Sequence, residues 1–161
     1  MFNVVLVEPQ IPQNTGNIAR VCAATDMQLI IAGRPAFKFS DRYLKRAGLD
    51  YWEYVRISHI PDVDAYFEQL DMSHTYLLTT KAQRPYTQIQ PQSSDSFLFG
   101  PETAGLPEWL LKANPQCCFT IPMKNPHVRS LNLATSVGIV MYEMLSRFNF
   151  GLDDHLAEGA C

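Results

Sequence analysis

The chain has 161 residues, of which 47% are hydrophobic and 18% are charged, so it is long enough to bury a substantial core and short enough that we expect a single domain. Its net charge of −3 does not demand a polyanionic partner, although a local basic face would be enough to bind nucleic acid. The four cysteines show no zinc-ligand spacing, which predicts reduced thiols, a cytoplasmic location and no bound metal.

The N-terminal part of the chain predicts strands that alternate with helices. Its first apolar run is closed by Pro9 and is far too short to span a membrane, so a buried strand explains it better than a signal peptide does. The first helix has helical apolar spacing, with Asn14 and Asn17 as candidate N-caps. The expected elements are strands over residues 3–8, 28–32 and 54–57, helices over residues 14–26 and 40–48, and a helix after Pro61.

The C-terminal part continues this alternation, which predicts an α/β fold with a mostly parallel sheet flanked by helices. We expect the domain to cover residues 1–150, and the acidic, aperiodic residues 151–161 to form a flexible tail. The expected elements are strands over residues 75–80, 96–100 and 119–122, a short helix that ends at Lys112 and a long apolar helix that ends near Arg147.

The first candidate site is the cluster Asn14, Gly16, Asn17 and Arg20, which follows the first strand. Asparagines there satisfy backbone N–H groups, and a glycine permits close approach of a ligand to the backbone. Arg20 lies one turn after Asn17, so both side chains could face one cleft and hold a phosphate or another anion. An ordinary helix cap followed by a solvated arginine explains the same residues equally well.

The second candidate site is a glycine-rich loop that follows an apolar strand and contains Gly100, Glu102 and Gly105. In parallel sheets, ligands bind beyond the carboxyl ends of the strands, where glycine lets a ligand lie against bare backbone. Glu102 could accept hydrogen bonds from a ligand or from the amides of its own loop. A tight turn braced by the glutamate is the simpler alternative.

The third candidate site is the polar loop 123–129 and the start of the long helix after it. Ser130 or Asn132 could cap this helix, whose apolar residues nearly encircle it and therefore predict burial on more than one side. Ala134 and Gly138 form an edge of small residues where another helix could approach closely. A central core helix and a dimer interface both fit this pattern.

Cationic residues elsewhere suggest a surface for RNA. Aromatic residues near a group of cations suit both the backbone and the bases of RNA, although a solvated helix face beside core aromatics is an equally good explanation. The candidate RNA-binding residues are Arg42, Lys45 and Arg46, close to Tyr51 and Trp52, together with Lys81, Arg84 and Arg129.

Taken in order, residues 14–20, 98–107 and 121–134 resemble the three sequence motifs of the SPOUT RNA methyltransferases. The resemblance extends from Met1 to about Phe150. It is greatest to the minimal bacterial tRNA ribose methyltransferases that modify the wobble cytidine or uridine of leucine tRNAs. The resemblance implies a C-terminal trefoil knot, which periodicity alone does not predict because knotted chains are rare.

The resemblance also implies S-adenosylmethionine as the methyl donor, tRNA as the partner and a homodimer whose site is completed by the first motif of the second subunit. The catalytic residues that it implies are Asn14, Asn17, Arg20 and Glu102. Arginine is a poor base because its pKa is above about 12, so positioning and phosphate binding suit Arg20 better. The residues implied to bind the donor are Leu78, Thr79, Gly100, Ile121, Ser130 and Leu131.

The expected reaction is methyl transfer to the ribose 2′-hydroxyl of the wobble nucleotide, either cytidine or a modified uridine. Two alternatives stay open at this point. The enzyme could methylate the ribose of another nucleotide in tRNA or ribosomal RNA, or the chain could be a dimeric RNA-binding protein that keeps the fold without catalysis.

Overall fold

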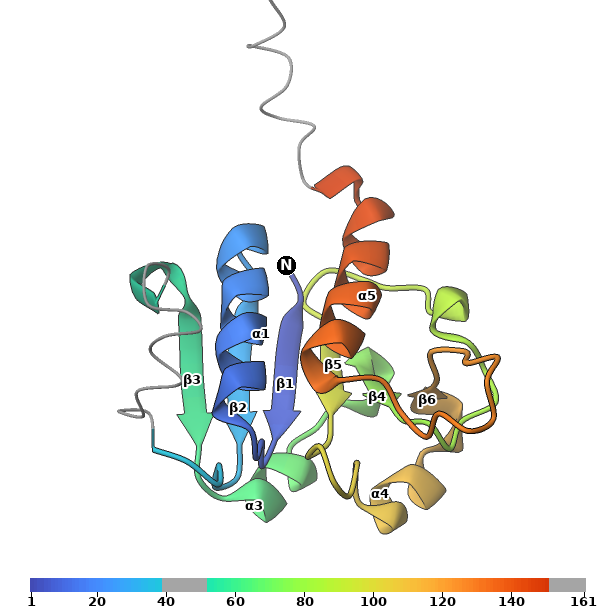
Figure 1. The fold of residues 1–161 in the computed structure, drawn as a ribbon. Coiled ribbons are helices and arrows are strands. Elements are labelled where there is room, and N and C mark those ends of the chain that lie inside the picture. Colours follow the sequence, from blue (N-terminus) through green and yellow to red (C-terminus); the bar gives the residue numbers. More distant parts are fainter. Residues whose placement is uncertain (39–51, 151–161) are drawn as a thin grey trace, which may run out of the picture.

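The computed structural model describes residues 1–38 and 52–150, and this part of the chain contains one parallel sheet flanked by helices (Figure 1). The sheet order is β3-β2-β1-β5-β4-β6. The expected α/β fold with a parallel sheet is therefore confirmed. The strands are β1 (Asn3–Val7), β2 (Gln28–Ala32), β3 (Arg56–Ile60), β4 (Thr75–Leu78), β5 (Ser96–Phe99) and β6 (Cys118–Phe119), and the helices are α1 (Pro12–Thr25), α3 (Val63–Glu68), α4 (Glu108–Ala113) and α5 (Leu133–Ser146).

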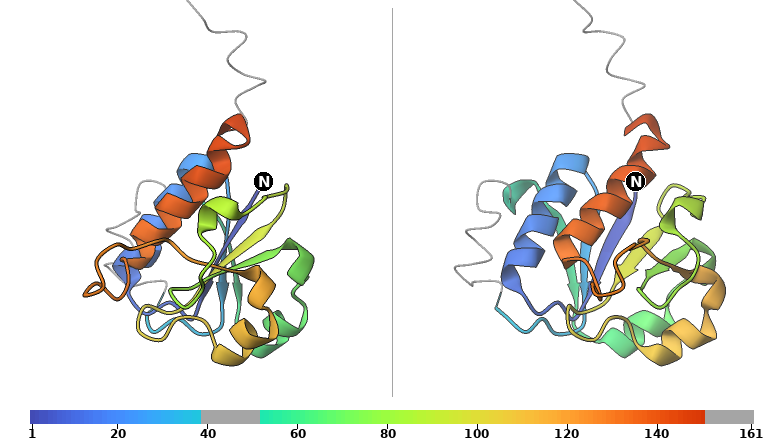
Figure 2. Two further views of the ribbon diagram at one scale, coloured as in Figure 1. Left: turned by 90° about the vertical axis from the view of Figure 1, so that its right-hand side faces the viewer. Right: turned by 45° about the vertical axis from the view of Figure 1, so that its right-hand side comes forward.

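Helices cover both faces of the sheet, as the continuous apolar strands require. Alternate residues of β1 enter different halves of the core: Val4 and Leu6 pack below α1 and α5, whereas Val5 and Val7 face α3 and α4. Figures 1 and 2 show α1 and α5 side by side on one face. The buried residues of α5 are Val137, Val140, Met141 and Met144, which confirms it as a core helix.

Several expected boundaries were wrong: besides those of α1 and β3, β6 is Cys118–Phe119 rather than residues 119–122, and β4 ends at Leu78 rather than at residue 80. Helix α1 begins at Pro12 after Ile11, and neither Asn14 nor Asn17 caps it. Proline suits this first position because its missing N–H would have had no helical partner. Strand β3 is Arg56–Ile60 rather than residues 54–57, because its pairing with β2 sets its register.

The start of α5 agrees with the sequence: Asn132 is its N-cap, and the side chain of Asn132 accepts a hydrogen bond from the backbone N–H of Thr135 at 3.2 Å. The expected helix over residues 40–48 and the expected tail over residues 151–161 lie outside the described residues.

The connection between β4 and β5 contacts the C-terminal part of the chain at two places. Next to β6, the N–H of Thr120 donates to the carbonyl of Arg84, and the N–H of Tyr86 donates to the carbonyl of Thr120, both at 2.8 Å. Beyond the end of α5, the guanidinium of Arg147 donates to the carbonyls of Ile89 and Thr87 at 2.6 and 2.7 Å. The connection thus holds the chain both before and after α5.

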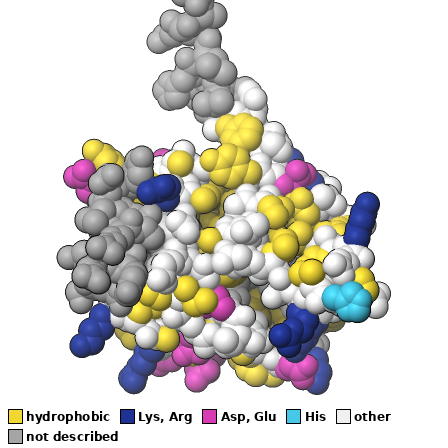
Figure 3. Space-filling view, viewed as in Figure 1, with side chains coloured by type: hydrophobic (Ala, Val, Ile, Leu, Met, Phe, Trp, Pro, Cys, Tyr) yellow, Lys and Arg dark blue, Asp and Glu magenta, His cyan; other side chains and the backbone are white. Residues whose placement is uncertain are grey.

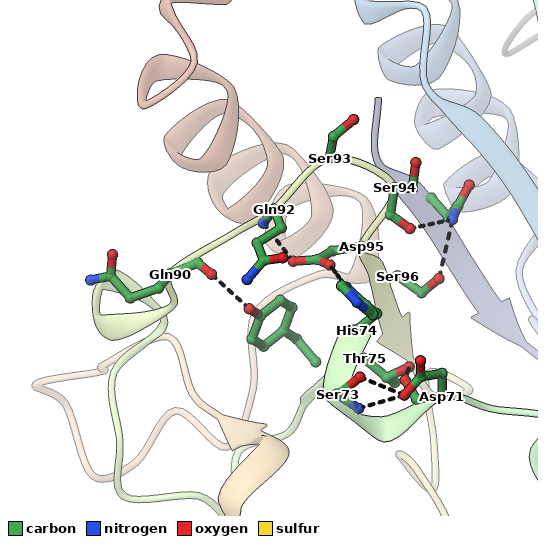
Figure 4. A network of polar contacts seen from close by, with 12 residues as sticks. Asp71, Ser73, His74, Thr75, Gln90, Gln92, Ser93, Ser94, Asp95 and Ser96 are labelled. Atoms are coloured by element: carbon green, nitrogen blue, oxygen red, sulfur yellow. Dashed lines mark hydrogen bonds and ion pairs between the residues drawn. The ribbon is translucent and has the colours of Figure 1, made fainter.

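A polar network closes the amino ends of β4 and β5 (Figure 4). The carboxylate of Asp95, which is 1% exposed, accepts hydrogen bonds from the backbone N–H of Gln92 at 2.6 Å and from Nδ1 of His74 at 2.7 Å. Nearby, Asp71 accepts hydrogen bonds from Ser73. These groups lie at the edge of the sheet opposite the strand ends where ligands usually bind, so we assign them a structural role.

Candidate active site

A cavity of about 700 Å³ lies beyond the carboxyl ends of β4, β5 and β6. Its size is within the range of small-molecule pockets, and its position is the usual one for a ligand in an open parallel sheet. We call it the central cavity. All six residues that the sequence predicted to bind the methyl donor line it: Leu78, Thr79, Gly100, Ile121, Ser130 and Leu131.

Gly100 is at this wall because no larger residue fits. A Cβ atom added to Gly100 would lie 2.2 Å from the carbonyl carbon of Gly105 and 2.3 Å from the nitrogen of Leu106. The loop returns so closely because Gly105 has a φ of +70°, in the left-handed region, and donates its N–H to the carbonyl of Pro101 at 2.9 Å. The cavity wall here is therefore bare backbone.

Glu102 joins this loop to the start of α1. One carboxylate oxygen accepts from the backbone N–H of Gln10 at 2.8 Å, and the other accepts from the N–H of Ile11 at 3.1 Å and from Nδ2 of Asn14 at 3.0 Å. The sequence left open whether a ligand or the amides of the loop itself would donate to Glu102. In the structure, the backbone donors belong to the segment that precedes α1, so this carboxylate braces two neighbouring loops.

Asn14 connects the first candidate site to the other two. Its side chain is buried, and its Oδ1 accepts a hydrogen bond from Nδ2 of Asn132 at 2.9 Å, while its own Nδ2 donates to Glu102. One continuous hydrogen-bond network therefore runs from the N-cap of α5 through Asn14 to Glu102. The three motifs that are far apart in the sequence meet at one wall of the central cavity.

Gln10 contacts the glycine-rich loop, although the sequence did not predict it as a site residue. Its side-chain oxygen accepts from the hydroxyl of Thr103 at 2.8 Å and from the backbone N–H of Thr103 at 3.3 Å. The available signal was its position three residues after the end of β1, at the same sheet edge as the other loops. Together with Glu102, it fixes the conformation of the glycine-rich loop.

The structure separates the four predicted catalytic residues into two pairs. Asn14 and Glu102 line the central cavity. Asn17 and Arg20 are exposed on α1 and do not line it within the described part of one chain. A role for Arg20 at the site therefore requires another molecule to lie against the exposed side of α1.

The predicted RNA-binding residues are also divided. Lys81 and Arg129 lie at the central cavity, whereas Arg42, Lys45 and Arg46 lie outside the described residues. Lys81 forms an ion pair with Glu108 at 3.2 Å.

Residues 1–38 and 52–150 contain no group of three or more His, Cys, Asp or Glu side chains that could hold a metal ion, and no helix among them is long and apolar enough to cross a membrane. Cys22, Cys117 and Cys118 are free and buried. Burial raises the pKa of the Cys22 thiol to about 12, so this thiol stays protonated near neutral pH.

Comparison with known proteins identifies the family of this chain. The model of the SpoU rRNA methylase family matches residues 1–142. The chain belongs to this family. Among curated SpoU relatives, the tRNA (cytidine(34)-2′-O)-methyltransferase of Yersinia pestis is 44% identical over 149 residues, and the protein of the same description from Escherichia coli K12 is 42% identical over 144 residues. Each alignment covers 89% of this chain and 91% of the relative.

Solved structures agree with this assignment. A structure described as giving insights into the 2-OH methylation of C/U34 on tRNA has a TM-score of 0.86 and 38% identity, and the match covers 92% of this chain and 97% of that one. An AdoMet-bound rRNA methyltransferase from Sinorhizobium meliloti has the same fold, with a TM-score of 0.78 and 23% identity over 91% of this chain and 56% of that one. The resemblance to SPOUT methyltransferases found in the sequence is confirmed.

Proposed function

We propose that this protein transfers a methyl group from S-adenosylmethionine to the ribose 2′-hydroxyl of nucleotide 34, a cytidine or a modified uridine, in leucine tRNAs. The observation that carries the proposal is the meeting of all three motifs at the central cavity, in a chain more than 40% identical to curated tRNA (cytidine(34)-2′-O)-methyltransferases.

The central cavity fits the proposed donor. It combines apolar side chains, among them Leu78, Ile121 and Leu131, with the bare backbone at Gly100 and the hydroxyls of Thr79 and Ser130. Apolar walls suit a purine ring, and backbone groups at strand ends suit its polar edge and the ribose. When bound, S-adenosylmethionine supplies an electrophilic methyl group on a sulfonium.

The residues of the chain then position the acceptor. Glu102 and Asn14 fix the wall next to the donor, because each is held in place by hydrogen bonds to the other and to neighbouring loops. We assign to Arg20 and Asn17 the task of holding the ribose and its phosphate. A guanidinium binds phosphate through paired N–H groups, and it lowers the cost of developing negative charge on the 2′-oxygen.

We propose that the protein is a homodimer in which α1 of one subunit presents Arg20 and Asn17 to the cavity of the other. The exposed side of α5 supports this arrangement. A Cβ added to Gly138 would meet no atom within 4 Å. Tyr142 on the same helix is 47% exposed, and Phe150, four residues after its end, is 44% exposed. Figure 3 shows hydrophobic side chains on the face that carries α1 and α5, as expected for an interface.

We further propose that residues 1–150 form a single domain with a trefoil knot. The support is the β4–β5 connection, which contacts the chain next to β6 at Thr120 and again after α5 at Arg147. A connection that holds both ends of residues 120–147 is in a suitable position to surround a threaded segment.

Methylation of defined tRNAs by the purified protein tests the function. A transcript of leucine tRNA and native leucine tRNA are incubated with labelled S-adenosylmethionine, and the modified nucleoside is mapped. With the wild-type protein, we expect label on the ribose of nucleotide 34 of the tRNA. With Arg20→Ala, we expect this label to be lost, while calorimetry shows that the variant still binds the donor. Label found only in ribosomal RNA, or only at another position of tRNA, would show that the proposed substrate is wrong. If the wild-type protein does not bind the donor, the non-catalytic RNA-binding protein is the better explanation.

Sedimentation tests the dimer separately. Gly138→Arg places a long charged side chain on the open edge of α5, so we expect a monomer that retains the fold by circular dichroism. If Gly138→Arg sediments like the wild-type protein, this face is not the interface.

A further inference from the structure

A second cavity of about 430 Å³ lies beside the central cavity, and we call it the side groove. It lies between α4 and the chain that follows β4, and Figure 1 shows α4 at the lower right of the molecule. The two cavities are neighbours, because Thr79 and Lys81 line both of them. The residues that line the side groove are Thr79, Lys81, Ala82, Gln83, Arg84, Glu108, Leu111, Lys112, Pro115 and Cys118.

The side groove is positively charged in a chain with a net charge of −3. Its lining includes three cations, Lys81, Arg84 and Lys112, and one carboxylate, Glu108, which leaves a local charge of +2. Glu108 accepts from Nζ of Lys81 at 3.2 Å and from Nζ of Lys112 at 3.1 Å. These two lysines hold the pKa of the Glu108 carboxyl below its usual value, the hydrogen bonds from Lys112 and Lys81 being the main cause.

Arg84 is held in a fixed orientation at this groove. Its guanidinium donates to the backbone carbonyls of Gln116 and Pro115, and its central carbon lies 4.4 Å from the centre of the Phe119 ring. A guanidinium that is fixed by carbonyls and stacked on an aromatic ring loses little freedom when it binds an anion. The groove therefore combines one preorganised cation with two mobile ones.

The ion pairs within the groove are easily exchanged. The side chains of Lys81, Glu108 and Lys112 are 55%, 60% and 77% exposed, and ion pairs between exposed groups contribute little to stability and are screened by salt. A phosphate that accepts a hydrogen bond from each of the two lysines could take the place of Glu108 between them. Glu108 then acts as an internal competitor for the site.

We propose that the side groove binds a backbone phosphate of the substrate RNA, on the strand that leads away from the nucleotide whose ribose enters the central cavity. This inference rests on the proposed RNA methyltransferase function and assigns a substrate subsite to it. RNA suits the groove better than an acidic protein does, because the groove shares Thr79 and Lys81 with the cavity that would receive the ribose, and its cations therefore lie next to the path open to the neighbouring phosphates of the same strand.

Binding of leucine tRNA and of an oligonucleotide of its anticodon arm tests the subsite, measured at several salt concentrations. The affinity constant K falls as the salt concentration rises. Removing a cation that contacts a phosphate makes the slope of log K against log salt shallower by about 1. For Lys112→Ala and Arg84→Gln we expect affinity to fall roughly three- to tenfold with a shallower slope. For Glu108→Gln we expect tighter binding, because the competing carboxylate is gone. That gain distinguishes a phosphate site from a merely structural ion pair.

Arg56→Ala is the matched control, because Arg56 also forms an exposed ion pair, with Asp26 at 2.8 Å, but at the opposite edge of the sheet. It should leave affinity and salt slope unchanged. Calorimetry with S-adenosylmethionine and thermal melts confirm that each variant is folded. If the wild-type protein methylates tRNA while Lys112→Ala, Arg84→Gln and Glu108→Gln all bind it with wild-type affinity and slope, the subsite is wrong and the function stands. If the wild-type protein neither binds nor methylates tRNA, the proposed function fails first.

Discussion

Asn132 donates a hydrogen bond from its Nδ2 to Oδ1 of Asn14 at 2.9 Å, across 118 residues of the chain. The other end of each amide is also engaged: Oδ1 of Asn132 accepts from the backbone of α5, and Nδ2 of Asn14 donates to Glu102. Each amide group can therefore have only one orientation. The start of α5 thus determines the position of the carboxylate that braces the glycine-rich loop, although the two segments are not neighbours in sequence.

Substitutions at Asn132 separate its two roles. Serine keeps an oxygen that can cap α5, but it is too short to reach Asn14, so Asn132→Ser leaves a buried acceptor unpaired and should lower the free energy of unfolding by about 1 kcal/mol. Asn132→Ala also loses the cap and should cost about 2 kcal/mol in total. Urea denaturation measures both. Equal stability of Asn132→Ser and the wild-type protein would show that the bond to Asn14 contributes nothing.

Gly100→Ala should damage the donor wall directly. The added Cβ would lie within 2.3 Å of two backbone atoms, which cannot move aside as a flexible side chain does, so we expect a loss of roughly 1–3 kcal/mol in stability and weaker binding of S-adenosylmethionine. Ala113→Ser, at an exposed position at the end of α4 and outside the lining of the central cavity, is the control and should change neither. Thermal melts and calorimetry with the donor report the two effects, and unaltered donor affinity in Gly100→Ala would contradict the proposed wall.

Thr15→Val should stabilise the protein. The hydroxyl of Thr15 is fully buried and has no hydrogen-bond partner within residues 1–38 and 52–150. Valine has the same shape without the polar atom, so we expect a gain of about 1 kcal/mol, or roughly 2–4 °C in Tm. Thr25→Val is a matched control on the same helix, because the hydroxyl of Thr25 donates to the carbonyl of Val21 at 2.7 Å. It should give no gain. A lower Tm for Thr15→Val would mean that this hydroxyl has a partner in the assembled protein.

Much of the fold was predictable because the strands are short apolar runs with clear ends. Residues 28–32 were predicted as a strand with the bounds that β2 has, since Gly33 follows directly. All six donor-binding residues that the resemblance to SPOUT methyltransferases implies lie at the central cavity, where the carboxyl ends of the parallel strands share one edge. Local patterns were sufficient wherever the structure depends on neighbours in sequence.

Long-range pairing was not predictable in the same way. Asn14 resembles a helix cap in sequence, but it is buried because Glu102 and Asn132 supply partners for its amide, and they lie 88 and 118 residues away. The exposed position of Arg20 agrees with one of the two interpretations of the sequence, a solvated arginine, but local spacing alone did not decide between that interpretation and a shared cleft. Residues that act through a distant segment or a second subunit have no signal in local spacing.

The pair formed by His74 and Asp95 makes stability depend on pH. The hydrogen bond from His74 to the buried carboxylate of Asp95 is the main cause that raises the pKa of His74 above its usual value of 6.5. Because the folded protein holds this proton more tightly than the unfolded chain, the contribution of the pair is fully present below about pH 6.5 and is lost as pH rises through the higher folded pKa. We therefore expect His74→Gln to lower Tm clearly at about pH 5.5 and less at about pH 9. His127→Gln, on the exposed loop before α5, is the control. A Tm difference between His74→Gln and wild-type protein that stays the same at both pH values would refute the charged pair.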